Sequence, residues 1–162
     1  MASRKSSTKV SMNAKISSIN LQSIPTDGAN SFVEGAPVKF GSQGYAAQPT
    51  AGDAIYVNFV DSSRADVMAL QGDPFQDSLA TRNTESGTLT GIRGNGCEIG
   101  LPAECWNGGV LPTIGNGVTV DGSSFLFKGE SVVSGSLYYG IVERISSGKA
   151  FFSFRTMPCV LA

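Results

Sequence analysis

Two long apolar segments near the end of the chain constrain its fold more than any other feature. Residues 137–145 and 149–156 are rich in aromatic and β-branched residues, and Ser146-Ser147-Gly148 separates them. Strong β-formers on both sides of a three-residue segment that ends in glycine predict a hairpin with a bulge. Because apolar side chains occupy successive positions, both faces of this hairpin are expected to be buried, in a barrel, a sandwich or a subunit interface.

Shorter apolar runs with turn residues between them continue this pattern along the chain. Only 15% of the residues are charged and 20 of 162 are glycine, which is typical of short strands joined by tight turns. The segment 32–40 contains Pro37 and is expected to be a broken or edge strand. Further strands are predicted at 54–60, 88–92, 97–101, 118–120 and 124–128, with Asp121-Gly122 as the turn between the last two.

The predicted fold is all-β, with a single compact β-barrel or β-sandwich domain and a flexible N-terminal arm. The arm comprises residues 1–16 and the domain residues 17–162, since a chain of this length suits one domain with a core of its own. The segment 61–86 shows no sustained periodicity. Irregular segments of this length often carry binding sites.

The arm differs from the rest of the chain in its charge. Its first fifteen residues hold four basic groups and no acidic one, whereas the remaining residues hold eight basic and thirteen acidic groups. Such a segment is either a solvated, frayed terminus or an arm that docks on an acidic neighbour. Removal of residues 1–16 is expected to leave the domain folded and to weaken assembly. The candidate assembly residues are Arg4, Lys5, Lys9, Val10, Met12, Lys15 and Ile16.

Apolar and polar residues alternate from Val10 to Ile16, as in a strand with one exposed face. A short strand that follows a loose arm is suited to extend the sheet of another subunit. It is equally suited to pair within its own domain, and this second alternative is the one we prefer.

The chain contains no histidine. This excludes Ser-His-Asp and Cys-His catalysis and most zinc sites. A pair of carboxylates remains possible for glycoside hydrolysis, with Asp73 and Asp77 as the nearest candidates and Asp61 and Asp66 upstream. Their segment offers only Phe75 as an aromatic platform, so these acids are better interpreted as solvated turn-formers. They also lack the spacing of a calcium-binding loop.

Two other patterns resemble catalytic or cofactor motifs but fail on spacing or context. The glycines of segment 91–100 do not fit the register of a dinucleotide-binding loop, and we interpret them as a turn between two strands. Ser146, Ser147 and Lys149 suggest a Ser-Lys dyad, but a lysine in an exposed turn stays solvated and charged. We therefore expect no enzymatic activity, no cofactor and no metal site.

The cysteines and the single tryptophan admit structural interpretations. Cys97, Cys105 and Cys159 are odd in number and lack metal-binding spacing, so we interpret all three as small buried apolar residues. Trp106 is either an anchor for a partner or a core residue.

Charge and hydropathy give expectations for location and partners. A net charge of −1 gives no general affinity for nucleic acid or anionic membranes. Neither a signal peptide nor an apolar stretch long enough to span a membrane is recognisable, so synthesis in the cytoplasm is expected.

Several glycine-rich phrases resemble those of small virion proteins of tailed bacteriophages. They are the segments 33–39, 52–53, 87–92, 117–122 and 139–142. The similarity is greatest to capsid decoration (cement) proteins and covers roughly residues 30–155. The resemblance implies a β-rich, often trimeric structural protein on the outer surface of the capsid. Its partners would be the major capsid protein and further copies of itself. Segment 61–86 has no counterpart in this resemblance.

Two other functions remain open. The chain is also compatible with a structural protein of the tail or of the head–tail junction. A carbohydrate-binding or carbohydrate-hydrolysing β-domain that uses segment 61–86 is the alternative from a different class.

Overall fold

The computed structural model describes residues 10–13, 20–28, 30, 32–59 and 88–161, and within them the fold is all-β, as predicted. No helix among these residues is long and apolar enough to cross a membrane. Two 3₁₀ turns, Ala103–Cys105 and Asn107–Gly109, follow β7. The strands are β1 (Ser11–Asn13), β2 (Asn20–Pro25), β3 (Pro37–Phe40), β4 (Ala46–Ala47), β5 (Tyr56–Phe59), β6 (Thr88–Arg93), β7 (Asn95–Pro102), β8 (Gly117–Val120), β9 (Phe127–Glu130), β10 (Leu137–Tyr138), β11 (Val142–Ser146), β12 (Lys149–Arg155) and β13 (Cys159–Val160).

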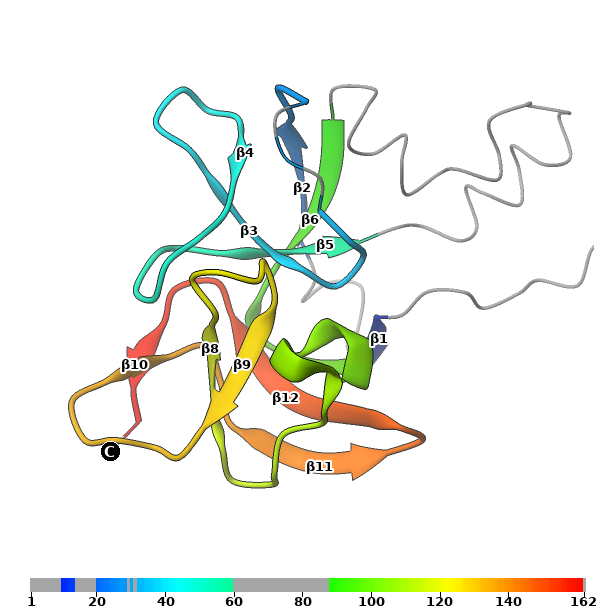
Figure 1. The fold of residues 1–162 in the computed structure, drawn as a ribbon, viewed down its shortest axis with the longest axis vertical. Helices are drawn as coiled ribbons and strands as arrows, with labels where there is room; N and C mark the ends of the chain where they lie inside the picture. Colours follow the sequence, from blue (N-terminus) through cyan, green and yellow to red (C-terminus); the bar gives the residue numbers. More distant parts are fainter. Residues whose placement is uncertain (1–9, 14–19, 29, 31, 60–87, 162) are drawn as a thin grey trace, which may run out of the picture.

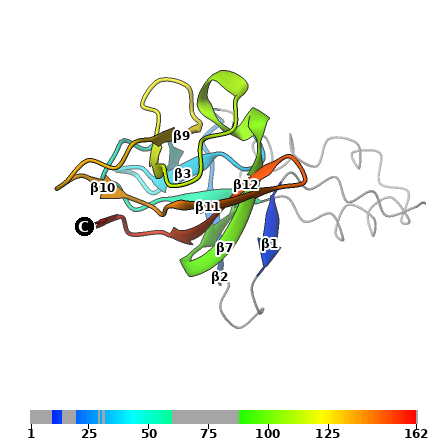
Figure 2. The ribbon, with the colours of Figure 1, turned by 90° about the horizontal axis from the view of Figure 1, so that it is seen from below.

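Two antiparallel sheets form the body of the molecule. One has the order β2-β6-β5-β3-β4 and the other β1-β7-β12-β11, while β8-β9 and β10-β13 form two-stranded ribbons. In Figure 1, β2, β5 and β6 occupy the upper part of the view and β11 and β12 the lower part. Figure 2 shows β1 beside β7 at the edge of the four-stranded sheet. Within the described residues no sheet closes into a barrel.

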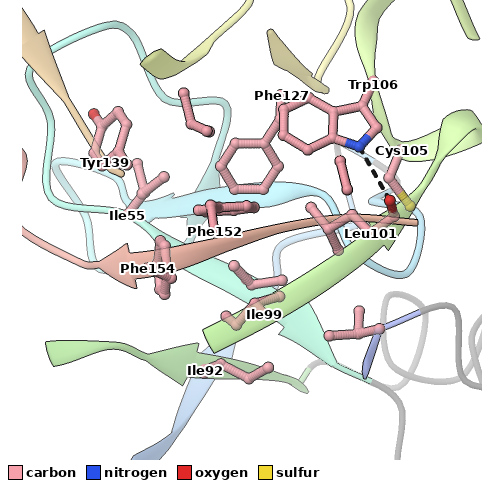
Figure 3. Packing of buried hydrophobic residues seen from close by; sticks show 14 of the residues in the cluster. Ile55, Ile92, Ile99, Leu101, Cys105, Trp106, Phe127, Tyr139, Phe152 and Phe154 are labelled. Carbon is pink, nitrogen blue, oxygen red and sulfur yellow. Dashed lines mark hydrogen bonds between the residues drawn. The ribbon is translucent and has the colours of Figure 1, made fainter. Parts of the chain in front are cut away.

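The main core lies between these sheets and is centred on aromatic side chains. Phe152 of β12 is fully buried, and its ring centroid lies 5.8 Å from those of Trp106 and Phe127 and 6.2 Å from that of Phe154. Figure 3 shows these rings packed beside Ile99 and Leu101 of β7. The other face of the five-stranded sheet carries a smaller cluster that includes Ile24, Val38 and Leu89. This sheet therefore has an apolar cluster on each face.

The glycines of segment 91–100 lie mostly within strands rather than in the predicted turn, since Gly91 belongs to β6 and Gly96 and Gly100 belong to β7. Gly94 links β6 to β7, which belong to different sheets, so the chain crosses from one sheet to the other there. A Cβ atom at Gly94 would overlap the ring of Phe154 and lie 2.6 Å from its carbonyl oxygen. At Gly100 it would overlap the ring of Phe151. Close packing against β12 explains these two glycines.

The C-terminal hairpin forms as predicted, but its turn is shorter. Ser146 pairs with Lys149, which leaves a two-residue turn with positive φ at Ser147 (54°) and Gly148 (75°). Such turns match the twist of the paired strands, which explains why no third residue is needed. The bulge lies instead between Val142 and Arg144, within β11.

The predicted strand 137–145 is divided into β10 and β11. A Cβ atom at Gly140 would lie 2.5 Å from the carbonyl oxygen of Ser153, so the chain approaches β12 closely at this point. The backbone around Gly140 also bonds to β8, with Val118 donating to the Gly140 carbonyl and Tyr139 donating to the Val118 carbonyl. The segment between β10 and β11 therefore contacts both the ribbon β8-β9 and strand β12 of the four-stranded sheet.

Two other strands begin three or more residues later than predicted. Ala36 donates to the carbonyl of Val33 in a turn, and β3 begins at Pro37. The strand expected at 124–128 is β9, Phe127–Glu130, because the Asp121 carboxylate accepts hydrogen bonds from Ser123 and Ser124 and extends the turn. This arrangement lowers the pKa of Asp121.

Tyr139 gives the fold an expected sensitivity to alkaline pH. Its fully buried side chain donates a 2.6 Å hydrogen bond to the Asp53 carbonyl, and burial raises its pKa to about 12 from an ordinary value of 10.0. Because the folded state favours the protonated phenol, this stabilisation is complete below pH 10 and is lost as the pH rises towards 12. The expected loss is about 2–3 kcal/mol.

Urea unfolding of the protein and of Tyr139→Phe at several pH values from about 9 to 11.5 tests this expectation. The variant should start less stable, because it lacks the hydrogen bond, but its stability should fall less with pH. Parallel pH profiles for the two proteins would contradict the assignment.

Candidate functional site

The predicted assembly arm joins the domain earlier than expected. Val10 is 3% exposed and belongs to the main core, and Ser11–Asn13 pair with Glu98–Gly100 of β7. Lys149 adds a 2.6 Å hydrogen bond from Nζ to the Ser11 hydroxyl. The strand thus pairs within its own domain, the alternative preferred from the sequence. Residues 10–13 are part of the folded domain, which corrects the arm boundary at residue 16.

The remaining assembly candidates divide into two groups. Met12 pairs with Ile99 in the register of β1 and β7. Arg4, Lys5, Lys9, Lys15 and Ile16 lie outside the described residues. The structure therefore fixes where the N-terminal segment enters the domain, beside β7 at a sheet edge.

A group of exposed apolar side chains surrounds the ribbon β10-β13. Leu137 and Val160 are paired across the ribbon and are 42% and 51% exposed. In the preceding loop, Val132 and Val133 are also exposed. The Tyr138 hydroxyl holds this loop, since it accepts from the Val133 N–H at 2.9 Å and donates to the Ser131 carbonyl at 3.3 Å. We call Val132, Val133, Leu137 and Val160 the ribbon patch.

The catalytic candidates weighed from the sequence do not converge in the described residues. Asp61, Asp66, Asp73 and Asp77 lie outside them. The Lys149 ammonium group donates a hydrogen bond to the Ser11 hydroxyl of β1, while the backbone of Lys149 pairs with Ser146 in the hairpin. Among the residues that the structure describes, no three cysteine or acidic side chains gather as a group that could hold a metal ion.

The cysteines and Trp106 are mostly core residues. Cys97 and Cys105 are buried and form no disulfide, as interpreted, and burial raises the pKa of Cys97. Cys159 is only partly buried, because it lies on the short ribbon strand β13. Trp106 is 1% exposed and donates from Nε1 to the Leu101 carbonyl at 3.2 Å, so it is a core residue and not a surface anchor (Figure 3).

Sequence reasoning missed an open pocket of about 560 Å³ where the two sheets meet. Three chain segments line it: the start of β5, the crossing from β6 to β7, and the end of β12. The only indication of this pocket in the sequence is an arginine near the end of each of two predicted strands, 88–92 and 149–156. The lining residues are Ala54, Tyr56, Arg93, Gly94, Asn95, Arg155, Thr156 and Met157.

The chain matches no protein-family model, no curated protein and no solved structure with which it was compared. A functional proposal therefore rests on the residues of this chain.

Proposed function

We propose that this protein is a non-enzymatic structural subunit of a bacteriophage particle, and specifically a decoration protein that binds the outer surface of the capsid. Its partners are then the major capsid protein and further copies of the chain. The single observation that best supports the proposal is the way the N-terminal segment is anchored: a basic segment precedes a strand that is built into the edge of a sheet.

One buried side chain and a short ladder anchor the N-terminal segment in the domain. Val10 is buried in the main core, and β1 forms a ladder with the central strand β7. The nine preceding residues include Arg4, Lys5 and Lys9 and no acidic residue. Bound to an acidic neighbour, these charges would attach the domain at a defined sheet edge.

The ribbon patch offers a second contact of a different kind. It combines paired apolar side chains on β10 and β13 with a loop that the Tyr138 hydroxyl fixes in place. Apolar surface held in one conformation costs little entropy to bury against a partner. An arm and a separate patch together suit a subunit that touches several neighbours, because weak contacts to one lattice add up.

Binding to capsids tests the proposed function directly. The purified protein is mixed with undecorated capsids of tailed phages and with their isolated capsid subunits, and bound copies are counted after sedimentation. We expect saturation at a fixed number of copies per capsid and no binding to isolated subunits. Failure to bind any capsid state would contradict the proposal. Density confined to the tail or to one vertex in particle images would instead assign a tail or head–tail function.

Truncation separates the arm from its anchor. Deletion of residues 1–9 should leave the free energy of unfolding unchanged, because Val10 and β1 remain. Deletion of residues 1–13 should lower it by at least about 2 kcal/mol, since the buried side chain of Val10 and the β1 ladder are both lost. This differs from the expectation drawn from the sequence, in which the whole segment 1–16 was dispensable for folding.

Urea unfolding and capsid sedimentation on the same two truncated proteins provide the measurements. The shorter deletion should weaken capsid binding while the domain stays folded. A full-length variant with Arg4→Gln, Lys5→Gln and Lys9→Gln is the matched control, because it removes charge without shortening the chain. Equal capsid binding by this variant and the parent protein would show that the basic charges do not act in assembly.

A further inference from the structure

The pocket between the sheets contains two arginines without a charged partner among the described residues. Arg93 ends its strand, β6, and Arg155 ends β12, and both are exposed. Three other basic side chains of the described residues form ion pairs, Lys39 with Asp53 at 3.0 Å, Lys128 with Glu130 at 3.6 Å and Arg144 with Glu98 at 2.7 Å. Lys149 has no acidic partner among these residues, but its ammonium group donates a 2.6 Å hydrogen bond to the Ser11 hydroxyl. The pocket thus differs from the rest of the described surface in presenting cations that are free to bind an anion.

Long-range pairing brings these two arginines together. Arg155 pairs with Asn95, two residues after Arg93, across a register shift at the end of the β7-β12 ladder. The Thr156 hydroxyl accepts from the Gly94 N–H at 3.0 Å, and the Thr156 N–H donates to the Gly94 carbonyl at 2.9 Å. The Ile55 N–H then donates to the Thr156 carbonyl at 3.0 Å. The floor of the pocket is therefore a rigid junction of three chain segments.

The remaining wall is apolar and partly fixed. The Tyr56 ring packs edge-on against Phe40, with 5.4 Å between the centroids. Met157 is 65% exposed at the rim, and Ala54 contributes a small side chain. Asn95 adds an amide that can both donate and accept hydrogen bonds. A ligand for this site needs an oxyanion for the arginines and apolar groups beside it.

We propose that this pocket binds an acidic peptide segment of a partner protein, with one side-chain carboxylate held between Arg93 and Arg155. The planar guanidinium group matches a carboxylate through two parallel hydrogen bonds, which makes arginine the preferred residue for this recognition. Tyr56 and Met157 then contact the apolar neighbours of the acidic residue. A net charge of −1 disfavours a long polyanion such as nucleic acid, which needs an extended basic surface. The inference stands whether or not the chain binds a capsid.

The test uses the full-length protein and a blocked hexapeptide in which glutamate alternates with leucine. Calorimetry or amide chemical shifts should detect binding of this peptide. The same peptide with glutamine in place of glutamate should bind about tenfold more weakly, and so should the glutamate peptide to Arg93→Gln or Arg155→Gln. Binding should also weaken as salt is added, because the site is open to solvent.

Lys128→Gln is the matched control, since it removes one exposed positive charge outside the pocket, and it should bind the peptide as the parent does. Unfolding in urea checks that all three variants are folded. Equal binding of the glutamate and glutamine peptides, or unchanged binding by both arginine variants, would overturn the proposal. Binding of inorganic phosphate or of a single-stranded oligonucleotide more tightly than the peptide would assign the pocket to another ligand and would also overturn it.

Discussion

Replacement of Phe152 by alanine is expected to lower the free energy of unfolding by about 3–5 kcal/mol, because it opens a cavity at the centre of the main core. The Phe152 side chain is fully buried and contacts three other aromatic rings, those of Trp106, Phe127 and Phe154. Phe154 shares β12 with Phe152, but Phe127 lies on β9 and Trp106 follows the turn Ala103–Cys105, so movement of one strand cannot close the cavity. Domains of this size are stable by only about 5–15 kcal/mol, so the variant should unfold at a much lower urea concentration.

Phe40→Ala is a suitable control for this experiment. Phe40 has the same side chain but is 39% exposed, and the structure records one ring contact for it, with Tyr56. Its replacement should cost about 1 kcal/mol. If both phenylalanine variants lost the same stability in urea unfolding, the packing around Phe152 would differ from that described.

Replacement of Gly94 by alanine is expected to cost about 3 kcal/mol, at the upper end of the usual effect of overpacking a core. The new Cβ atom would overlap the Phe154 ring and lie 2.6 Å from the Phe154 carbonyl oxygen. The ring is buried among other core side chains, and the hydrogen bonds between Gly94 and Thr156 hold the two chain segments together. Neither neighbour can move away without breaking the junction of the two sheets.

Gly122→Ala is the control for Gly94→Ala, because it adds the same methyl group at a position with open space. No atom lies within 4 Å of the Cβ that this substitution would introduce, and its φ is not in the positive range. The stability of this variant should stay within about 1 kcal/mol of that of the parent. Thermal or urea unfolding of the two glycine variants compares the loss of stability at a crowded position, Gly94, with that at an uncrowded one, Gly122. Equal stability would mean that β7 and β12 do not approach as closely as described.

The sequence predicted those strands whose own residues favour β-structure. Segment 88–92 became β6 and segment 149–156 became β12, each within one residue at its ends. Local propensity sufficed there because the segments are rich in β-branched and aromatic residues. The class of the fold followed from the same signal.

Features that depend on distant residues could not be predicted. Nothing in the sequence indicates that β12 packs closely against Gly94 and Gly100, and the glycines of segment 91–100 are interpreted there only as a turn between two strands. At the break around Gly140 the backbone bonds to Val118, which lies outside the predicted hairpin. The pocket was missed for the same reason, because only the pairing of β7 with β12 brings Arg155 towards Arg93. In each case the relevant neighbour comes from a segment that local periodicity does not identify.

The pairing of β1 with β7 has a consequence for the order of folding. A chain leaves the ribosome from its N-terminus, so Ser11–Asn13 emerge long before Glu98–Gly100, the residues with which they pair. Val10 likewise can pack in the main core only after Leu101 and Cys105, which belong to the same cluster, have been synthesised. Contacts between segments so far apart slow folding, because the loop between them must close before the contact stabilises anything. β1 therefore stays without its native partner until β7 has been synthesised.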